Sequence, residues 1–459
     1  MDFVDLRKRE FSRLDELNQA YLDYTGSGLY SKWQIDQHFK YLRKNVLGNP
    51  HTNSPSSLTS TEQIDHARKR VLDHFNAHEN EYCVVFTQNS TGALKLVGEG
   101  YPFGSNSRYV LTSDNHNSVN GIREFARKKG ARVVYIPIDF EMKLSDLSPY
   151  LPKVKSGTHS LFAFPAQSNF SGTRYPLEWI DLAKSRGYDV ILDAAAYVPT
   201  NRLNLGAVKP DFVPVSFYKM FGYPTGVGAL IARKTAIEKL VRPWFSGGTI
   251  DIVTTQYISH HMIEGYQRFE DGTPSFLDIS AIPVGLTFLE RVGMGNIHRH
   301  VMSLSKKLSN NLKKLKHSNG VSLIKIYGPA NDDMMGSVIS FNLITPGGTI
   351  VDSRIVGKLA KEHNISVRTG CFCNPGSGER FFNYSAKNEE KCIENMFKGI
   401  SSIDDFPKCA GEGAGGAIRA SLGIASNEND VMRLVDVLST MKDCSEEINE
   451  EYELPPLTC

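Results

Sequence analysis

The region between about residues 80 and 235 alternates short apolar runs with segments of helical character, and no other feature constrains the fold of this chain as strongly. Such alternation is the signature of an α/β sheet covered by helices on both faces. Helices are predicted at 91–99, at 118–129, which ends at Gly130, and at 177–185. The strands are predicted at 82–87, 108–112, 132–137, 160–165, 189–193, 212–217 and 227–232.

A smaller α+β region is predicted to follow the sheet. Its elements are predicted at 278–316 (helical), 337–343 and 366–368 (strand-like) and 428–442 (a closing helix). We therefore expect a large domain over 25–285 and a small C-terminal domain over 286–445. Residues 1–24 are predicted to form an N-terminal segment that packs on the small domain, and residues 446–459 an acidic tail.

The composition is that of an ordinary globular protein without strong electrostatic character. The chain has 459 residues, of which 41% are hydrophobic, and this is enough to bury a sizeable core. Its 52 basic and 50 acidic side chains leave a formal charge of +2, so we predict neither nucleic acid nor a membrane as a partner. No signal peptide or bilayer-spanning run is recognisable, and we expect a cytoplasmic protein that acts on a small molecule.

The seven cysteines do not form the pattern of a disulfide framework. Their number is odd and they are spread over a long chain, so we expect reduced thiols. Cys83 lies in an apolar run and is predicted to be a small buried hydrophobe. No matching pair of His or Cys residues stands near Cys371 and Cys373 in the sequence, and no metal site is predicted.

A lysine and an aspartate follow two of the predicted strands and indicate a cofactor. Asp193 ends the apolar run 189–193, and Lys219 stands 26 positions later, just past another strand. An enzyme that holds pyridoxal phosphate needs both groups, because the lysine amine condenses with the cofactor's aldehyde and the aspartate keeps the pyridine nitrogen protonated. Ligands of such sheets bind at the carboxyl ends of the strands, where both residues are predicted to lie.

The polar turn Thr87–Ala93 is the predicted phosphate site. It lies between a strand and a helix, so backbone N–H groups at the helix N-terminus point at a bound anion. Ser90 and Thr91 add hydroxyl donors, although a simple helix cap explains the turn equally well when it is taken alone. Residues 411–416 satisfy G-x-G-x-x-G, but they precede a strand-like run instead of opening a helix, and we interpret them as a loop.

Five motifs, in chain order, resemble those of a known enzyme family. The first four, which resemble successive motifs of class V aminotransferase-fold enzymes, are Asp114–Val119, Phe164–Gly172, Leu192–Ala196 and Ser216–Lys219. The fifth, Gly370–Gly376, is similar to the N-terminal cysteine desulfurase domain of molybdenum cofactor sulfurases, and the match runs from about Tyr21 to Leu438. The resemblance implies fold type I of the pyridoxal phosphate enzymes, with a mostly parallel seven-stranded sheet in the large domain and a smaller α+β C-terminal domain.

The resemblance also implies roles for single residues. His116 would stack on the pyridine ring, Asn169 would lie near the cofactor's phenolic oxygen, and Lys219 would carry the cofactor. Ser216 and Tyr218 are further expected cofactor contacts. These residues stand at predicted strand ends in the family's order, which makes coincidence a poor explanation.

A homodimer is implied by the segment Phe269–Pro274. It resembles a family segment that crosses a dimer interface, so Thr273 would touch the phosphate bound by the neighbouring subunit. Two departures refine the assignment: Ala196 stands where many cysteine desulfurases have glutamine, and Tyr218 where they have histidine. Both resemble the molybdenum cofactor sulfurase branch.

Residues 366–373 and one further arginine are predicted to determine which reaction the enzyme catalyses. Arg368 resembles the family's substrate-carboxylate residue, with Arg419 as a second candidate, because an arginine grips a carboxylate with a bidentate fork. Cys373 aligns with the family's persulfide-forming cysteine. In a C-x-C pair on extended backbone both side chains face the same way, so Cys371 could resolve a disulfide or relay sulfur, or have no chemical task.

The activity implied by the resemblance is that of a cysteine desulfurase or sulfurtransferase. L-cysteine would give L-alanine and a persulfide on Cys373, ready for a sulfur-acceptor protein or for the molybdenum cofactor. C–S lysis, epimerisation or transamination of another amino acid is the alternative, and a non-enzymatic subunit is a third class, against which Lys219, Asp193 and His116 argue. The chain ends at Cys459, and we expect it to lack the C-terminal domain that holds the molybdenum cofactor in this family.

Overall fold

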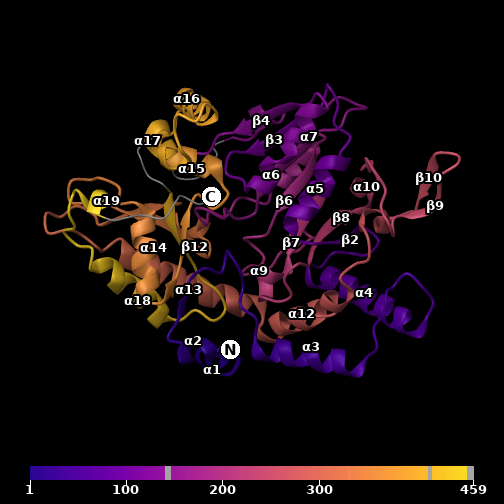
Figure 1. Cartoon of the computed structure of the whole chain (residues 1–459), viewed down its shortest axis with the longest axis horizontal. Helices are drawn as coiled ribbons and strands as arrows, with labels where there is room; N and C mark the ends of the chain where they lie inside the picture. The colour runs from indigo at the N-terminus through magenta and orange to yellow at the C-terminus, as the bar shows by residue number, and fades with distance from the viewer. Residues whose placement is uncertain (140–145, 330, 412–415, 452–459) are drawn as a thin grey trace.

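A seven-stranded sheet forms the centre of the larger half of the molecule (Figure 1). The structure is a computed structural model that describes residues 1–139, 146–329, 331–411 and 416–451. The strands are β2 (Tyr82–Thr87), β3 (Arg108–Thr112), β4 (Arg132–Ile136), β5 (Leu161–Pro165), β6 (Asp189–Asp193), β7 (Phe212–Ser216) and β8 (Gly228–Arg233). They lie in the order β2-β8-β7-β6-β5-β3-β4, with β8 antiparallel to both neighbours and the pairs from β7 to β4 parallel. The predicted mostly parallel sheet is confirmed.

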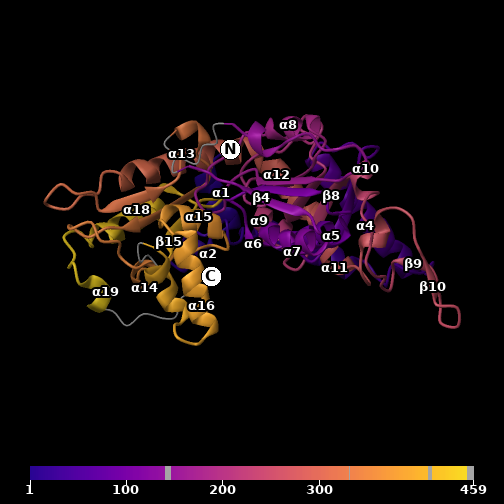
Figure 2. The ribbon, with the colours of Figure 1, turned by 90° about the horizontal axis from the view of Figure 1, so that it is seen from above.

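Alternate residues of the strands enter two hydrophobic cores, one on each face of the sheet. In β5, Leu161 and Ala163 belong to one core, whereas Phe162 and Phe164 belong to the other. The helices that add side chains to the first core are α5 (Ser90–Gly100), α6 (Asn117–Asn120), α7 (Ile122–Lys128) and α10 (Lys234–Ile237). Those that add to the second are α4 (Pro55–His74), α8 (Trp179–Ser185), α9 (Phe217–Phe221), α11 (Phe276–Ile279) and α12 (Ile282–Val292). Figure 2 shows α7 and α8 on opposite sides of the sheet.

Two predicted helices are interrupted at glycines. The helix predicted at 118–129 is divided at Gly121 into α6 and α7. The helix predicted at 278–316 becomes α11, α12 and α13 (Met294–Leu312), and Gly293 separates the last two. Gly293 has a φ of 85°, which glycine adopts readily and other residues do not. Hydrophobic periodicity predicted the helices but not these breaks.

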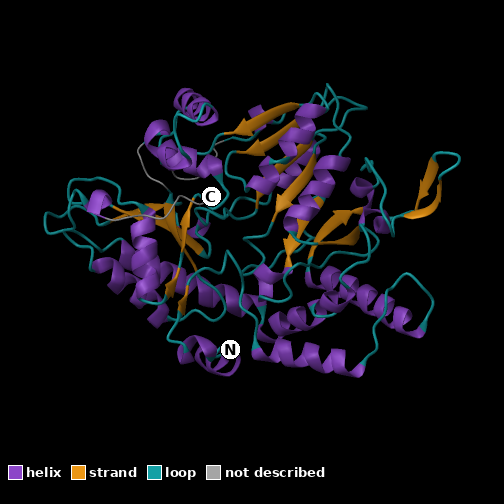
Figure 3. Cartoon of the chain, in the orientation of Figure 1, coloured by secondary structure: helices purple, strands orange, loops and turns teal. Residues whose placement is uncertain are grey.

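The small domain is built on a four-stranded antiparallel sheet (Figure 3). Its strands, in spatial order, are β11 (Ile324–Tyr327), β12 (Val338–Leu343), β15 (Ala417–Ser421) and β14 (Arg368–Gly370). Its helices are α13, α14 (Ser353–Glu362), α15 (Pro375–Phe381), α16 (Ala386–Phe397), α17 (Phe406–Ala410), α18 (Glu428–Ser439) and α19 (Ile448–Glu451). Single 3₁₀ turns stand at Ser148–Tyr150 and Tyr266–Phe269 in the larger part of the molecule, and at Asp332–Met334 and Ile403–Asp405 in the small domain. In register, Arg368 of β14 lies opposite Arg419 of β15.

The N-terminal segment reaches both halves of the molecule. It contains α1 (Phe3–Glu10), α2 (Arg13–Glu16) and β1 (Ala20–Tyr21), and β1 pairs in parallel with β13 (Ile365–Ser366) of the small domain. Arg7 donates to the carboxylate of Asp430 at 2.6 Å, and Glu10 accepts from the backbone N–H of Trp33 at 2.9 Å. Helix α3 (Lys32–Lys44) follows and contacts α12.

A two-stranded hairpin projects from the large domain. It is formed by β9 (Ile250–Thr254) and β10 (Ser259–Met262), and Figures 1 and 2 show it standing away from the rest of the chain. Within the described ranges, no helix is both long enough and apolar enough to cross a membrane. Part of the predicted acidic tail, 452–459, and residues 412–415 of the predicted glycine-rich loop lie outside the described residues.

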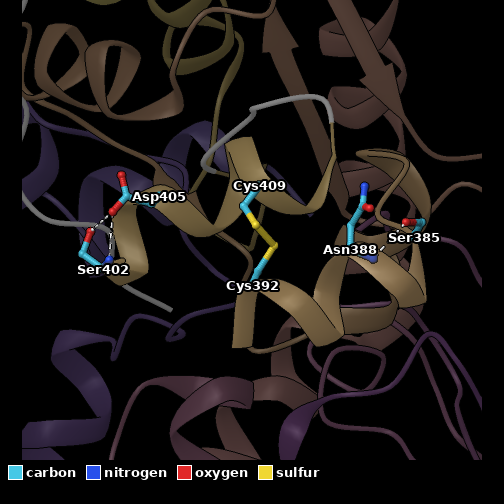
Figure 4. Close-up of a disulfide and its surroundings, with 6 residues drawn as sticks. All are labelled: Ser385, Asn388, Cys392, Ser402, Asp405 and Cys409. Atoms are coloured by element: carbon cyan, nitrogen blue, oxygen red, sulfur yellow. Dashed lines mark hydrogen bonds between the residues drawn. A yellow bond between two sulfur atoms is a disulfide. The ribbon is translucent and has the colours of Figure 1, made fainter. Parts of the chain in front are cut away.

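A disulfide joins Cys392 of α16 to Cys409 of α17 (Figure 4). The two helices pack on each other, and this packing brings the two Cα atoms to 6.0 Å. The expectation of reduced thiols is therefore wrong for this pair, because sequence spacing alone does not reveal which cysteines meet. Because disulfides persist mainly in oxidising compartments, the redox state of this pair in cells is a test of the predicted cytoplasmic location. Cys83 is buried as predicted, and burial raises the pKa of its thiol to about 12.

Candidate active site

A cavity at the carboxyl ends of β6 and β7 collects most of the predicted cofactor residues. Strand ends, the N-terminus of α5 and the turn before α6 form its walls. Its lining includes eight predicted residues, namely Ser90, Thr91, His116, Asn169, Asp193, Ser216, Tyr218 and Lys219. They come from five separate stretches of the chain. The sequence shows only their order along the chain, and the fold brings them together in space.

Lys219 and Asp193 both line this cavity. Asp193 is the last residue of β6 and accepts a hydrogen bond from the backbone of Ala195 at 3.0 Å, while Lys219 lies on α9 directly after β7. Burial lowers the pKa of Lys219, with Arg419 and Arg368 acting in the same direction and Asp193 opposing them. A larger share of the amine is therefore neutral near pH 7 than for an exposed lysine.

His116 is held in one orientation by the turn that it begins. Its Nδ1 accepts from the backbone N–H of Ser118 at 3.1 Å and lies 3.0 Å from the Ser118 hydroxyl. Burial lowers the pKa of His116, against the opposing charge of Asp193. With Nδ1 as an acceptor, the neutral ring carries its proton on Nε2. A flat neutral ring on the cavity wall suits the predicted stacking role.

Asn89 caps the N-terminus of α5, which forms the predicted phosphate end of the cavity. Its side chain accepts from the backbone of Gly92 at 2.9 Å, so the helix-cap interpretation of this turn holds for Asn89. The Ser90 hydroxyl lies 2.8 Å from Ser216 Oγ, and the Thr91 hydroxyl lies 2.8 Å from Ser118 Oγ. Hydroxyls thus surround the helix N-terminus, which is a favourable place for a phosphate.

Asn169 has contacts that its predicted role did not include. Its amide nitrogen donates to the carbonyl of Phe372 at 2.7 Å, and its amide oxygen accepts from Asn374 at 2.9 Å. Asn169 therefore connects the cavity to the segment that carries Cys373. The resemblance predicted the residue but not this link, because the two partners lie more than 200 positions away.

Both predicted carboxylate-binding arginines converge on Asp23. Arg368 donates to Asp23 at 2.7 Å and Arg419 at 3.1 Å. Arg419 is buried, donates also to the Asn169 carbonyl at 3.0 Å, and has its guanidinium 4.7 Å from the Phe372 ring. Burial lowers the pKa of Arg419 to about 10, against the opposing charge of Asp23. Its Nε is buried and makes no hydrogen bond to any described residue.

Cys373 lies on a tight loop between β14 and α15. Phe372 and Cys373 have φ values of 56° and 53°, so the backbone here is left-handed. The expectation of an extended C-x-C segment, with Cys371 facing the same way as Cys373, is therefore wrong. The Cys373 carbonyl accepts from the backbone of Asn117 at 2.7 Å, which places the loop against the turn that follows His116.

Thr273 lies outside the cavity. It is exposed on the loop after Phe269, where Asn49 donates to its hydroxyl at 3.2 Å. Its predicted contact belongs to a neighbouring subunit and stays a prediction. Across the described ranges, no group of three or more His, Cys, Asp or Glu side chains is placed to hold a metal ion.

Two functional candidates were missed by sequence reasoning. Asp23 holds both arginines, and Asp114 is a fully buried carboxylate two positions before His116. Asp114 begins the first resembling motif, so the motif itself was the available signal. Asp23 lies inside the matching range, but nothing in its neighbours indicates that two arginines from distant strands reach it.

Comparison with known proteins identifies the family of this chain. The family model described as aminotransferase class-V matches residues 20–434. The chain belongs to the class V aminotransferase family. The lining residues fit pyridoxal phosphate, since a lysine of lowered pKa, a carboxylate and a hydroxyl-rich helix N-terminus are the groups that this cofactor requires. The predicted family, enzyme class and cofactor are thus confirmed.

Individual relatives of this class V protein are sulfur-handling enzymes. It is 38% identical to a molybdenum cofactor sulfurase of Solanum lycopersicum, over 96% of this chain and 58% of the relative. It is 37% identical to that of Homo sapiens, over 93% of this chain and 50% of the relative. The chain spans about half the length of the curated relatives that it matches. A cysteine desulfurase structure from Thermococcus onnurineus NA1 superposes with a TM-score of 0.77 at 26% identity, covering 95% of this chain and 97% of that one.

Proposed function

We propose that this chain is a cysteine desulfurase that removes sulfur from L-cysteine, releases L-alanine and holds the sulfur as a persulfide on Cys373. The supporting observation is the position of Cys373, whose loop is hydrogen-bonded to the turn that carries His116 and to Asn169 of the cavity wall. Electrostatic interaction with Cys373 raises the pKa of both Lys219 and Arg419, which supports a position of the thiol near the two groups.

Substrate binding and proton transfer are assigned to different residues. Arg419 binds the substrate carboxylate, and Asp23 holds its guanidinium in place. When pyridoxal phosphate is bound to Lys219, it supplies a ring that stabilises negative charge at the substrate α-carbon and makes the Cβ–S bond labile. Lys219, once displaced by the substrate amine, can accept and return the α-proton because burial lowers its pKa.

Sulfur transfer balances without an external oxidant. Cys373 Sγ attacks the substrate sulfur, an S–S bond forms, and the Cβ–S bond breaks with its electron pair remaining on carbon. Protonation of that carbon completes alanine. One L-cysteine and one thiol therefore become one L-alanine and one persulfide, and a thiol reductant releases the persulfide sulfur for the next turnover.

Alanine release from L-cysteine by the cofactor-loaded protein tests the proposal. With a thiol reductant present, alanine should form, and Cys373→Ala should abolish it while keeping the visible absorbance of the bound cofactor. Lys219→Ala should remove both signals, since the lysine is the attachment point. Alanine, pyruvate or another product that persists in Cys373→Ala would favour C–S lysis or a different reaction on another amino acid.

We also propose that the active protein is a homodimer. The hairpin of β9 and β10 exposes Ile252 (64%), Tyr257 (80%) and Ile258 (96%), and Trp244 beside it is 52% exposed. Apolar side chains gathered on a projecting element are typical of an interface. Thr273 is also exposed, as a residue of a partner's phosphate site would be in a single chain.

Subunit mixing tests this arrangement directly. Lys219→Ala and Thr273→Ala are each expected to be weakly active or inactive alone. If Thr273 completes the neighbouring site, a mixed dimer contains one site with both groups intact, so mixing the two variants should restore activity. No restoration in a verified mixed dimer would place Thr273 outside the neighbouring site.

The sulfur acceptor and the compartment are further parts of the proposal. Identity to proteins named molybdenum cofactor sulfurase supports the molybdenum cofactor as the final acceptor, reached directly or through an acceptor protein. A cytoplasmic location is retained from the sequence analysis, and Cys392 and Cys409 give its simplest check. Thiol counting on protein rapidly alkylated in cells should find both reduced if the compartment is reducing.

A further inference from the structure

Asp114 is a fully buried carboxylate whose oxygens accept four side-chain hydrogen bonds. Its exposed fraction is 0%, and it lies between β3 and α6. The donors to Asp114 are Ser168 Oγ (2.9 Å), Tyr175 OH (2.7 Å), Asn374 Nδ2 (2.5 Å) and Ser377 Oγ (2.8 Å). A buried carboxylate is costly unless its oxygens are satisfied in this way. None of the catalytic steps proposed above uses Asp114.

The two oxygens of Asp114 serve different parts of the molecule. Oδ2 accepts from Tyr175, which belongs to the large domain. Oδ1 accepts from Ser168 of the large domain and also from Asn374 and Ser377, which begin helix α15 of the small domain. Oδ1 is therefore the point at which the first turn of α15 is fastened to the large domain.

The loop of Cys373 is continuous with this fastened turn. Asn374 follows Cys373 directly, caps α15 by accepting from the backbone of Ser377, and donates to Asn169 as well as to Asp114. The carbonyls of Phe372 and Cys373 accept from Asn169 and Asn117 respectively. Phe372 and Cys373 both have left-handed backbone, which non-glycine residues keep only when their surroundings impose it.

We propose that Asp114 is a positioning residue that holds the Cys373 loop over the active site through Asn374 and Ser377. This inference rests on the proposed role of Cys373 as the sulfur acceptor. Asp114 touches no reacting atom and acts by fixing where the thiol lies. Its loss lets the first turn of α15 leave the large domain, and the loop relaxes from its left-handed conformation.

The substitution that isolates this role is Asp114→Asn. It keeps the shape of the side chain and one acceptor oxygen, but it removes the negative charge that strengthens the hydrogen bonds from Asn374 and Ser377. The matched control is Tyr175→Phe, which removes the bond to Oδ2 and leaves both bonds from α15 to Oδ1. Ser377→Ala is the milder variant on the α15 side, because it removes one donor only.

The primary readout is the alkylation rate of Cys373 by iodoacetamide in cofactor-loaded protein without substrate. Fragment ions of the labelled peptide distinguish Cys373 from Cys371. Loss of charge assistance in the two hydrogen bonds from α15 should raise the Cys373 rate about tenfold in Asp114→Asn, and loss of one hydrogen bond should raise it about threefold in Ser377→Ala. Tyr175→Phe should stay within about twofold of the wild-type rate.

A second readout separates positioning from general damage. Asp114→Asn should lower kcat for alanine release about tenfold while KM and the visible cofactor absorbance change little, because Arg419 and Lys219 keep their contacts. Unchanged alkylation in Asp114→Asn, or in Ser377→Ala if the first variant does not fold, overturns the inference. Equal effects of Tyr175→Phe and Asp114→Asn overturn it too. Alkylation needs no turnover, so it reports on the loop even if L-cysteine is not the substrate.

Discussion

Gly376 offers a sharp test of how closely helix α15 approaches the large domain. A β-carbon built on Gly376 would lie 2.2 Å from the backbone oxygen of Ser113 and 2.8 Å from its carbonyl carbon. The backbone of Ser113 is itself held, since its N–H donates to the Ile136 carbonyl at 2.8 Å. Gly376→Ala therefore forces α15 away from the end of β3. Because the obstructing atoms are backbone, we expect the upper end of the usual overpacking cost, about 3 kcal/mol.

Gly378 is the matched control in the same helix. A β-carbon there would have its nearest contact 3.9 Å away, at Cδ2 of Phe382, which is ordinary van der Waals distance. Gly378→Ala should stabilise the protein by about 0.5 to 1 kcal/mol, because alanine has the higher helix propensity. Both variants make the same Gly→Ala change in the same helix and differ only in its position. Their free energies of unfolding should differ by roughly 4 kcal/mol.

Urea unfolding of both variants measures this difference. The midpoint of Gly376→Ala should fall and that of Gly378→Ala should rise relative to wild type, with unchanged slopes. Local release of α15 without global unfolding would instead appear as faster alkylation of Cys373 in Gly376→Ala, at a nearly unchanged midpoint. If Gly376→Ala matches Gly378→Ala in both stability and alkylation rate, α15 does not rest on Ser113 and the packing argument is refuted.

Three further predictions follow from the charges and the disulfide. Arg419→Lys should raise KM for L-cysteine about tenfold with little change in kcat, because a lysine cannot bind Asp23 and a carboxylate together; an unchanged KM would exclude Arg419 from substrate binding. Burial lowers the pKa of His74 to about 4, so below pH 6.5 the unfolded chain binds a proton that the native state refuses. The free energy of unfolding should thus fall by about 3 kcal/mol from pH 6.5 to 4, a loss that His74→Gln should largely remove in urea titrations. Replacing both Cys392 and Cys409 by serine should lower stability by up to about 3 kcal/mol and leave alanine release unchanged; an unchanged midpoint would mean that the bridge constrains nothing.

Much of the large domain could be predicted from the sequence. The strands at 108–112 and 189–193 have the predicted bounds, because a buried strand is a local apolar run between polar turns. The positions of Asp193 and Lys219 at strand ends could be predicted for the same reason. Helix breaks could not, since Gly121 and Gly293 lie within continuous hydrophobic periodicity.

The sequence by itself determined the sheet, the family and most of the residues that line the cavity, because those signals lie in short contiguous runs. The tertiary structure alone decided how Asp23 meets Arg368 and Arg419, which are 345 and 396 positions away, and how Asp114 meets Asn374 from 260 positions away. It also decided which two cysteines pair. Such contacts depend on how two domains pack and on strand register, and neither is encoded in the spacing of neighbouring residues.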